Sequence, residues 1–164
     1  MKSAVLTGVA LALASVGLVG CQQASEQPSS EQTQAAPDGP AGIAVSQGRL
    51  VLPPVKGNPA AVYFEIANNG EADTQIVGVA VDGAQSAMLH ETVQSDGISS
   101  MHHRDAVPLT KGSTVPFAPG GYHVMAMNLS DDLQAGGSTE VTLTFANGDK
   151  VSFPVEIRSP GDAG

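Results

Sequence analysis

The side chains best suited to holding a metal ion are gathered in one part of this chain. Apart from Met1, every methionine and every histidine lies between positions 88 and 127. Thioether sulfur is a soft, uncharged ligand that suits Cu(I), and imidazole suits copper as well. The cluster therefore predicts a copper site. Its members are Met88, His90, Met101, His102, His103, His123, Met125 and Met127.

The local spacing of these residues indicates β-strands. Residues two apart on a strand share a face, so His123 and Met125 would place an imidazole beside a thioether. Met88 and His90 would repeat this pair on another strand, and Met101–His103 follow a turn at Asp96-Gly97. We expect two strands and a loop to bring their ligands together at one end of a β-domain.

Other metals and other copper proteins fit this composition less well. Zinc prefers thiolate, imidazole and carboxylate, whereas calcium and magnesium need clustered oxygen ligands. A blue-copper electron-transfer site needs a cysteine thiolate, and the only cysteine is Cys21. No general acid or base lies close to the cluster in the sequence, so we expect a binding protein and not an enzyme.

The elements that must position these ligands are predicted to be strands. Residues 60–67 and 75–81 are rich in β-forming residues, and 141–145 and 151–157 alternate apolar and polar positions about a turn at 147–149. Pro154 cannot donate a ladder hydrogen bond, which predicts an edge or bulged strand there. The fold class we expect is all-β, a Greek-key β-sandwich of about seven to nine strands.

The spacing of four ligands resembles a known family. Ten residues separate His90 from Met101, and twenty-one separate Met101 from His123-Val124-Met125. This spacing is similar to the metal signature of periplasmic copper chaperones of the PCu(A)C type, and the flanking segments 89–92 and 119–122 match as well. The resemblance implies a cupredoxin-like sandwich that binds one Cu(I) through His90, Met101, His123 and Met125. It also implies copper delivery towards the CuA centre of cytochrome oxidase, with a thiol-dependent copper partner.

The remaining donors have two interpretations each. For Met88 and Met127 we favour core packing over ligation, because methionine often fills gaps in a core. His103 shares strand parity with Met101 and is an additional candidate ligand, or else a solvated histidine. Glu91 and Asp105 are expected to be surface charges, either of which could orient an imidazole through its second nitrogen.

The beginning of the chain resembles a bacterial lipoprotein signal. An apolar stretch over 4–19 ends in Leu18-Val19-Gly20-Cys21, which predicts a signal peptide over 1–20 and lipidation of Cys21. Gln22 after the cysteine favours the outer membrane. We expect a disordered tether over 21–41, a copper-binding domain over 42–158 and a short disordered tail over 159–164. The protein would then face the periplasm, held to the membrane by its lipid.

The charge excludes one class of partner and leaves other roles open. With 7 Lys and Arg against 16 Asp and Glu, the formal net charge is −9, which argues against binding nucleic acid. A periplasmic copper buffer is the alternative to a copper chaperone. A metal-free structural lipoprotein is another, but it would leave the clustering of Met and His unexplained.

Overall fold

The computed structural model describes residues 39–161, and this part of the chain is all β-structure with no helix. Cys21 and the predicted signal lie outside the described residues, as does most of the predicted tether. Ten strands are formed, because the segment expected to be a ligand-bearing loop pairs as a strand of its own. They are β1 (Ile43–Val51), β2 (Ala60–Asn68), β3 (Thr74–Val81), β4 (Ala84–Ser95), β5 (Ile98–His103), β6 (Val107–Leu109), β7 (Thr114–Phe117), β8 (Tyr122–Leu129), β9 (Ser138–Phe145) and β10 (Lys150–Arg158).

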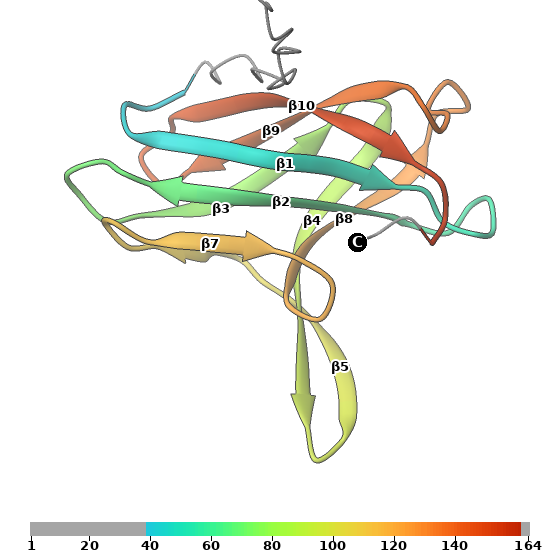
Figure 1. Cartoon of the computed structure of the whole chain (residues 1–164), viewed down its shortest axis with the longest axis horizontal. Coiled ribbons are helices and arrows are strands. Elements are labelled where there is room, and N and C mark those ends of the chain that lie inside the picture. Colours follow the sequence, from blue (N-terminus) through green and yellow to red (C-terminus); the bar gives the residue numbers. More distant parts are fainter. Residues whose placement is uncertain (1–38, 162–164) are drawn as a thin grey trace, which may run out of the picture. The chain divides into compact units, whose positions relative to one another are not determined.

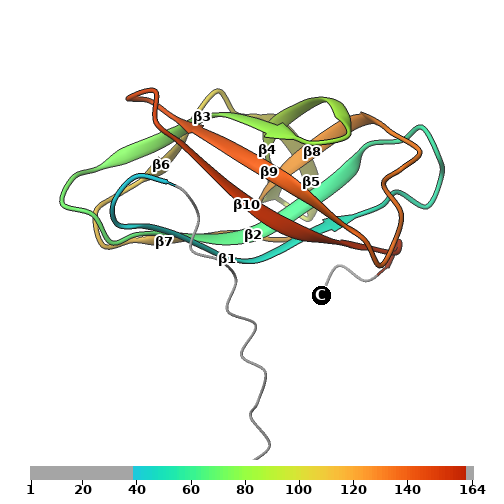
Figure 2. The ribbon, with the colours of Figure 1, turned by 90° about the horizontal axis from the view of Figure 1, so that it is seen from above.

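The strands form one hydrogen-bonded sheet that curls round to enclose a core. Their order is β5-β4-β8-β7-β2-β1-β10-β9-β3-β6, with a further pairing of β8 to β2. Most neighbours are antiparallel, whereas β1 with β10 and β7 with β8 are parallel. Curling brings β3 against β4, although they are distant in the strand order. The result is a cupredoxin-like β-sandwich, whose layers are visible in Figures 1 and 2.

The core is built from the inward positions of alternating strands. On β2 the residues Val62, Phe64 and Ile66 are buried, and the residues between them are only half-buried. Phe64 stacks on Phe117 with ring centroids 4.2 Å apart, and it meets Phe153 edge-on at 5.2 Å. Each such side chain removed from water contributes about 1.5–3 kcal/mol, so these strands are held chiefly by this shared interior.

The predicted hairpin near the end of the chain is confirmed. β9 and β10 pair without a register shift, and their alternating apolar residues are buried. The connection closes with Phe145 and Asp149 joined by a backbone hydrogen bond, and Gly148 has φ of 89°. Glycine suits this position because a positive φ strains other residues.

The expectation for Pro154 was wrong in one respect. β10 is an interior strand between β1 and β9, not an edge. The irregularity lies instead in the neighbouring strand β1, where the register with β2 shifts between Ser46 and Arg49 and Gln47 has φ of 57°. Gly48 in this bulge lies so close to β10 that an added Cβ would stand 3.2 Å from the Pro154 carbonyl oxygen. The bulge thus places a residue without a side chain where β1 passes Pro154.

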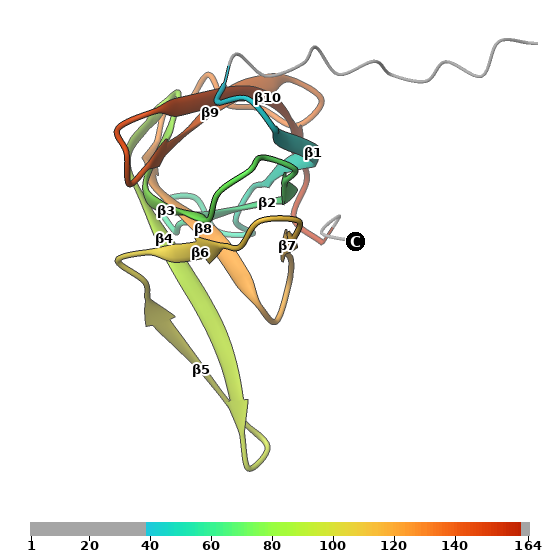
Figure 3. The same ribbon diagram turned by 90° about the vertical axis from the view of Figure 1, so that its left-hand side faces the viewer.

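The β4–β5 hairpin extends away from the body of the sandwich, as Figure 3 shows. β5 ends the strand order and pairs only with β4, and each of its residues is exposed. The turn at Asp96 and Gly97 has positive φ at both residues, as a tight two-residue hairpin turn requires. The base of this hairpin is where the candidate ligands gather.

Candidate metal centre

Three neighbouring strands carry the predicted ligands. His90 lies on β4, Met101 on β5, and His123 and Met125 on β8, and β4 is hydrogen-bonded between the other two. We expected the group around Met101 to lie on a loop, and this was wrong: residues 98–103 pair with β4 over their whole length. A strand fixes which way Met101 points more firmly than a loop would.

The register places His90 at the centre of the group. It is directly opposite His123 on β8 and directly opposite His103 on β5. The ring centroids are 5.9 Å apart for His90 and His123, and 5.6 Å apart for His90 and His103. Residues directly opposite one another share a face of the sheet, so the three imidazoles form a row across the three strands.

The thioethers lie in the adjacent rows of the same face. Met125 is opposite Met88 on β4, one step from His90, and Met101 is opposite Thr92, one step to the other side. Strand parity therefore puts two imidazoles and two thioethers on one surface, as the spacing predicts. The structure brings the four predicted ligands to neighbouring positions of one sheet face.

This face is opposite to the core. The intervening residues Leu89, Val124 and Ala126 point inward and belong to the buried core. Core packing, which we favoured for Met88 and Met127, is accordingly wrong: both are half-buried on the ligand-bearing face and outside the core cluster. The reason is that each strand offers two faces, and the smaller apolar residues occupy the inner one.

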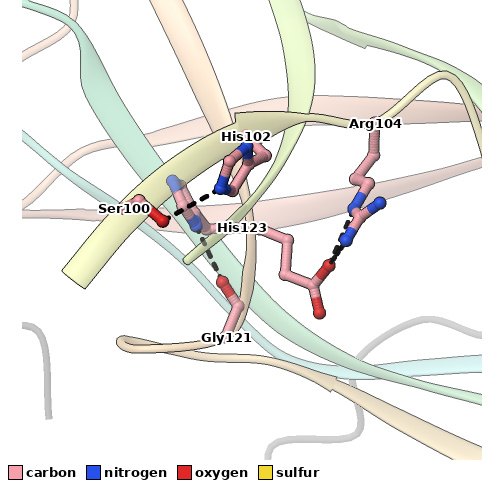
Figure 4. Close-up of polar contacts among 6 residues, drawn as sticks. Ser100, His102, Arg104, Gly121 and His123 are labelled. Carbon is pink, nitrogen blue, oxygen red and sulfur yellow. Dashed lines mark hydrogen bonds and ion pairs between the residues drawn. The ribbon is translucent and has the colours of Figure 1, made fainter. Parts of the chain in front are cut away.

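His123 is prepared to donate a nitrogen lone pair. It is 5% exposed, and its Nδ1 lies 3.0 Å from the carbonyl oxygen of Gly121, which can only accept a hydrogen bond (Figure 4). Nδ1 therefore carries the proton, and Nε2 has the free lone pair. Nε2 is buried and has no hydrogen-bond partner. A buried polar atom left unpaired costs about 1–3 kcal/mol, so this geometry suits an atom that is completed by a ligand.

His90 is held in the neutral form that binds metals. Burial lowers the pKa of this imidazole below its usual value, and the nearby His123 and His103 lower it further. Its Nδ1 is also buried without a hydrogen-bond partner. Two facing histidines thus each present an unpaired buried nitrogen, which is unusual for a structural pair.

The exposure of the thioethers differs across the site. Met101 is 53% exposed on the outer strand, whereas Met125 is half-buried on β8. A metal held by this set would have a sheltered side formed by His123 and Met125. It would have an accessible side formed by Met101 at the hairpin.

The charged residues beside the site form two separate pairs. Glu91 and Arg104 make an ion pair across the base of the hairpin, drawn in Figure 4. Asp105 Oδ1 lies 3.3 Å from His103 Nε2, so this carboxylate contacts an imidazole, as the sequence suggested that it could. His102 points to the other face, where its Nε2 is 2.9 Å from Ser100 Oγ. Of the two adjacent histidines, only His103 faces His90.

Sequence reasoning missed an aromatic residue next to the site. Tyr63 on β2 lies with its ring centroid 6.5 Å from that of His123, and the Arg49 guanidinium is 5.1 Å above the Tyr63 ring. Burial raises the pKa of Tyr63, and the charge of Arg49 acts against this rise. The composition of 60–67 predicted a strand but not the neighbour of Tyr63. Nothing in the sequence indicated that β2 pairs with β8 at Met125.

The rest of the described chain adds no competing metal cluster. Within residues 39–161, no three His, Cys, Asp or Glu side chains are grouped so that they could hold a metal ion, thioethers not being counted. In the same range no helix is long and apolar enough to cross a membrane.

The fold defines the class of protein to which the chain is similar. Among solved structures, the apo PCuAC domain from PmoF1 is 26% identical and has a TM-score of 0.60, covering 73% of this chain and 95% of that one. The structure titled CuI-DR1885, from Deinococcus radiodurans, is 24% identical with a TM-score of 0.58, covering 74% of this chain and 80% of that one. The β-sandwich described above therefore has the fold of PCuAC domains.

The chain itself belongs to the LpqE-like family. The model of that family, described as "Putative lipoprotein LpqE-like", matches residues 43–157. A relative from Leifsonia xyli subsp. xyli (strain CTCB07), named "Putative lipoprotein Lxx21020", is 31% identical over 144 residues and spans 87% of this chain and 83% of its own. The family and this relative are both described as lipoproteins, in keeping with the lipidation predicted at Cys21.

Proposed function

We propose that this protein is a Cu(I)-binding metallochaperone of the cell envelope, which holds one Cu(I) ion through His90, Met101, His123 and Met125. It binds and transfers the metal and catalyses no reaction on a further substrate. Cys21 anchors it by lipid at the periplasmic side of the envelope, in the outer membrane. The predicted segment 21–41 is the tether between that anchor and the copper-binding domain of residues 42–158.

The pair of facing histidines carries the proposal. His90 and His123 are opposite one another, and each has a buried nitrogen without a hydrogen-bond partner. The thioethers of Met101 and Met125 occupy neighbouring rows of the same face. Two neutral imidazoles and two thioethers form a soft, uncharged set, which favours Cu(I) over Cu(II), zinc and the hard cations.

The comparisons support copper as the metal. The similar structure from Deinococcus radiodurans is titled as a Cu(I) form, and the fold of this chain is that of PCuAC domains. The resemblance in ligand spacing further supports a role for the bound copper in the cell envelope. There the chain would give Cu(I) to the cytochrome oxidase subunit that carries CuA, together with a thiol-dependent copper protein.

The direct test is a competitive Cu(I) titration of the reduced full-length protein in detergent, against a chromophoric Cu(I) chelator. All samples should carry Cys21→Ser, because any chain left unlipidated at Cys21 would present a free thiol that itself binds Cu(I). We expect one tight equivalent, with two nitrogen and two sulfur ligands in X-ray absorption, and much weaker binding of Cu(II) and Zn(II). Tighter binding of Zn(II) than of Cu(I), or equal affinity for both copper states, would overturn the proposal.

A copper buffer is a second candidate, because further donors surround the four ligands. Met88, Met127 and His103 lie on the same face and could raise the capacity for copper. Transfer separates the two roles. A chaperone would load an apo CuA domain faster than free diffusion from a chelator of equal affinity does. A buffer would show no such advantage, and a strain lacking it would retain oxidase activity at low copper.

A further inference from the structure

A second group of donors lies on the other side of His90 from His123. His103 is directly opposite His90, and the backbone N–H of Arg104 donates to the carbonyl of Leu89 at 2.9 Å, which continues the same register past the end of β5. Asp105 follows directly, and it lines the same cavity as Met88. A thioether, an imidazole and a carboxylate thus meet beside the four-ligand site.

These three residues lie at the rim of a small surface cavity. A space of about 140 Å³ lies where β3 packs against β4, and Met88, His103 and Asp105 are among the residues that line it. The opposite wall is formed by Val77, Gly78 and Val79 of β3, where the register with β9 shifts between Ile76 and Gly78. This irregularity in β3 coincides with the point at which the curled sheet leaves an opening, and the opening is large enough for an ion.

The contact between His103 and Asp105 orients the imidazole. Asp105 Oδ1 is 3.3 Å from His103 Nε2. With the Nε2–H directed to the carboxylate, the Nδ1 lone pair of His103 is available to a metal, an arrangement that recurs around metal-binding histidines. The neighbouring His102 lacks such a carboxylate partner and makes its hydrogen bond with Ser100 on the opposite face.

We propose that His103 and Met88 form a second, weaker Cu(I) position beside the first, with Asp105 as the residue that orients His103. This inference rests on the proposed function, since the second position adjoins the first through His90. The side chain of His103 is 53% exposed, so the second position is open to a partner. In the first position, by contrast, His123 is buried. An ion arriving or leaving would occupy the second position before or after it is held by His90.

The test is a Cu(I) titration of the full chain carrying Cys21→Ser, in detergent and under reducing conditions, with Cu(I) itself as the probe. We expect a tight first equivalent and a weaker second one in the wild type. His103→Ala and Met88→Leu should each abolish the second equivalent and change the first by less than about threefold, while Asp105→Asn should weaken the second by about tenfold. The matched controls are His102→Ala and Met127→Leu, which should retain both equivalents.

The outcomes separate the two proposals. A wild-type protein that binds one tight equivalent and no second would overturn the second position and leave the proposed function intact. A second equivalent that persists in both His103→Ala and Met88→Leu would also overturn it, because the ion would then lie elsewhere. Absence of the tight first equivalent would overturn the proposed function and this inference with it. Circular dichroism of each apo variant checks that the fold is retained.

Discussion

His90 and His123 lie directly opposite one another on neighbouring antiparallel strands, with ring centroids 5.9 Å apart and a buried, unpaired nitrogen on each. Neither imidazole satisfies the other, although both are shielded from water at these atoms. An arrangement of this kind lowers the stability of the apo protein in exchange for a site that is ready to bind. Substitutions at different positions should therefore separate apo stability from copper affinity.

Met101→Leu should remove copper affinity without affecting folding. The thioether is lost while shape and hydrophobicity are nearly kept, and the side chain is 53% exposed. We expect Cu(I) affinity to fall by at least about 100-fold, because even the loss of a residue that only hydrogen-bonds to a metal ligand can lower metal affinity by up to about 100-fold. The free energy of unfolding of the apo protein should change by less than about 0.5 kcal/mol. Chelator competition and denaturant unfolding measure the two effects.

His123→Ala should affect both properties. This side chain is 5% exposed, so its removal leaves a cavity beside Tyr63 and also removes a hydrogen bond to the Gly121 carbonyl. The cavity and the lost hydrogen bond are offset in part by removal of the unpaired Nε2, so we expect a net loss of about 1 kcal/mol in unfolding free energy. The loss of Cu(I) affinity should be comparable to that of Met101→Leu. An unchanged unfolding midpoint would show that the ring is not packed as described.

Asn68→Ala should destabilise the fold without changing copper affinity, which is the opposite of the effect expected for Met101→Leu. The buried Asn68 amide donates to the carbonyls of Ala72 and Leu109 at 2.9 and 3.0 Å, and its oxygen accepts from the Gly70 N–H at 3.0 Å. Truncation leaves these backbone groups unpaired, so we expect a cost of about 2–3 kcal/mol. Because Asn68 contacts none of the four ligands, Cu(I) affinity of the folded fraction should be unchanged. A parallel loss of affinity would mean that this end of the sandwich is coupled to the metal centre.

The stability of the apo protein should fall on acidification because of His90. Its pKa in the folded protein is lowered by burial and then by the neighbouring histidines, whereas the unfolded chain takes up this proton near pH 6.5. Below about pH 6.5 the unfolded state therefore binds more protons, and stability is lost as the pH falls towards the folded-state pKa; above 6.5 this group contributes no pH dependence. Thermal unfolding from pH 5 to 8 should show a shallower loss for His90→Gln than for the wild type. His102→Ala is the control, and equal slopes for His90→Gln and the wild type would contradict this reasoning.

Copper affinity, like the stability of the apo protein, should fall as the pH is lowered. Imidazole must be neutral to bind metal, while thioethers do not titrate, so Cu(I) affinity should be flat above about pH 7.5 and fall in acid. With two histidine ligands, the limiting slope should approach two protons per copper. His90→Met should reduce it towards one. An affinity that stays constant from pH 5 to 8 would indicate a site made of methionines alone.

Much of the arrangement of the candidate metal centre could be predicted from local sequence. The two-residue period of a strand places His123 beside Met125 and Met88 beside His90, and the structure has both pairs on one face. Strand parity also indicated that His103 shares a face with Met101, and the structure places His103, not His102, opposite His90. These inferences needed no knowledge of which strands are neighbours.

The remaining features depend on contacts between distant segments. Met127 was assigned to the core because methionine often fills gaps there, but the sequence of β8 has apolar residues on both faces of the strand. Which face is inward depends on β2 and β4, with which β8 pairs. The interior position of β10, the strand of Pro154, likewise depends on its pairing with β1, about a hundred residues earlier in the chain. Non-local pairing of this kind leaves no trace in a short window of sequence.

In the proposed site, the position of Met101 on a strand with a single neighbour would affect how quickly the metal could leave. β5 pairs with β4 alone, all its side chains are exposed, and it ends at His103 beside the site. Such an edge element opens at a much lower free energy than the body of a sandwich does. Fraying of β5 would withdraw Met101 while His90, His123 and Met125 stay in place on β4 and β8. One ligand could thus dissociate at a time, which would allow a bound ion to be exchanged in small steps without unfolding the domain.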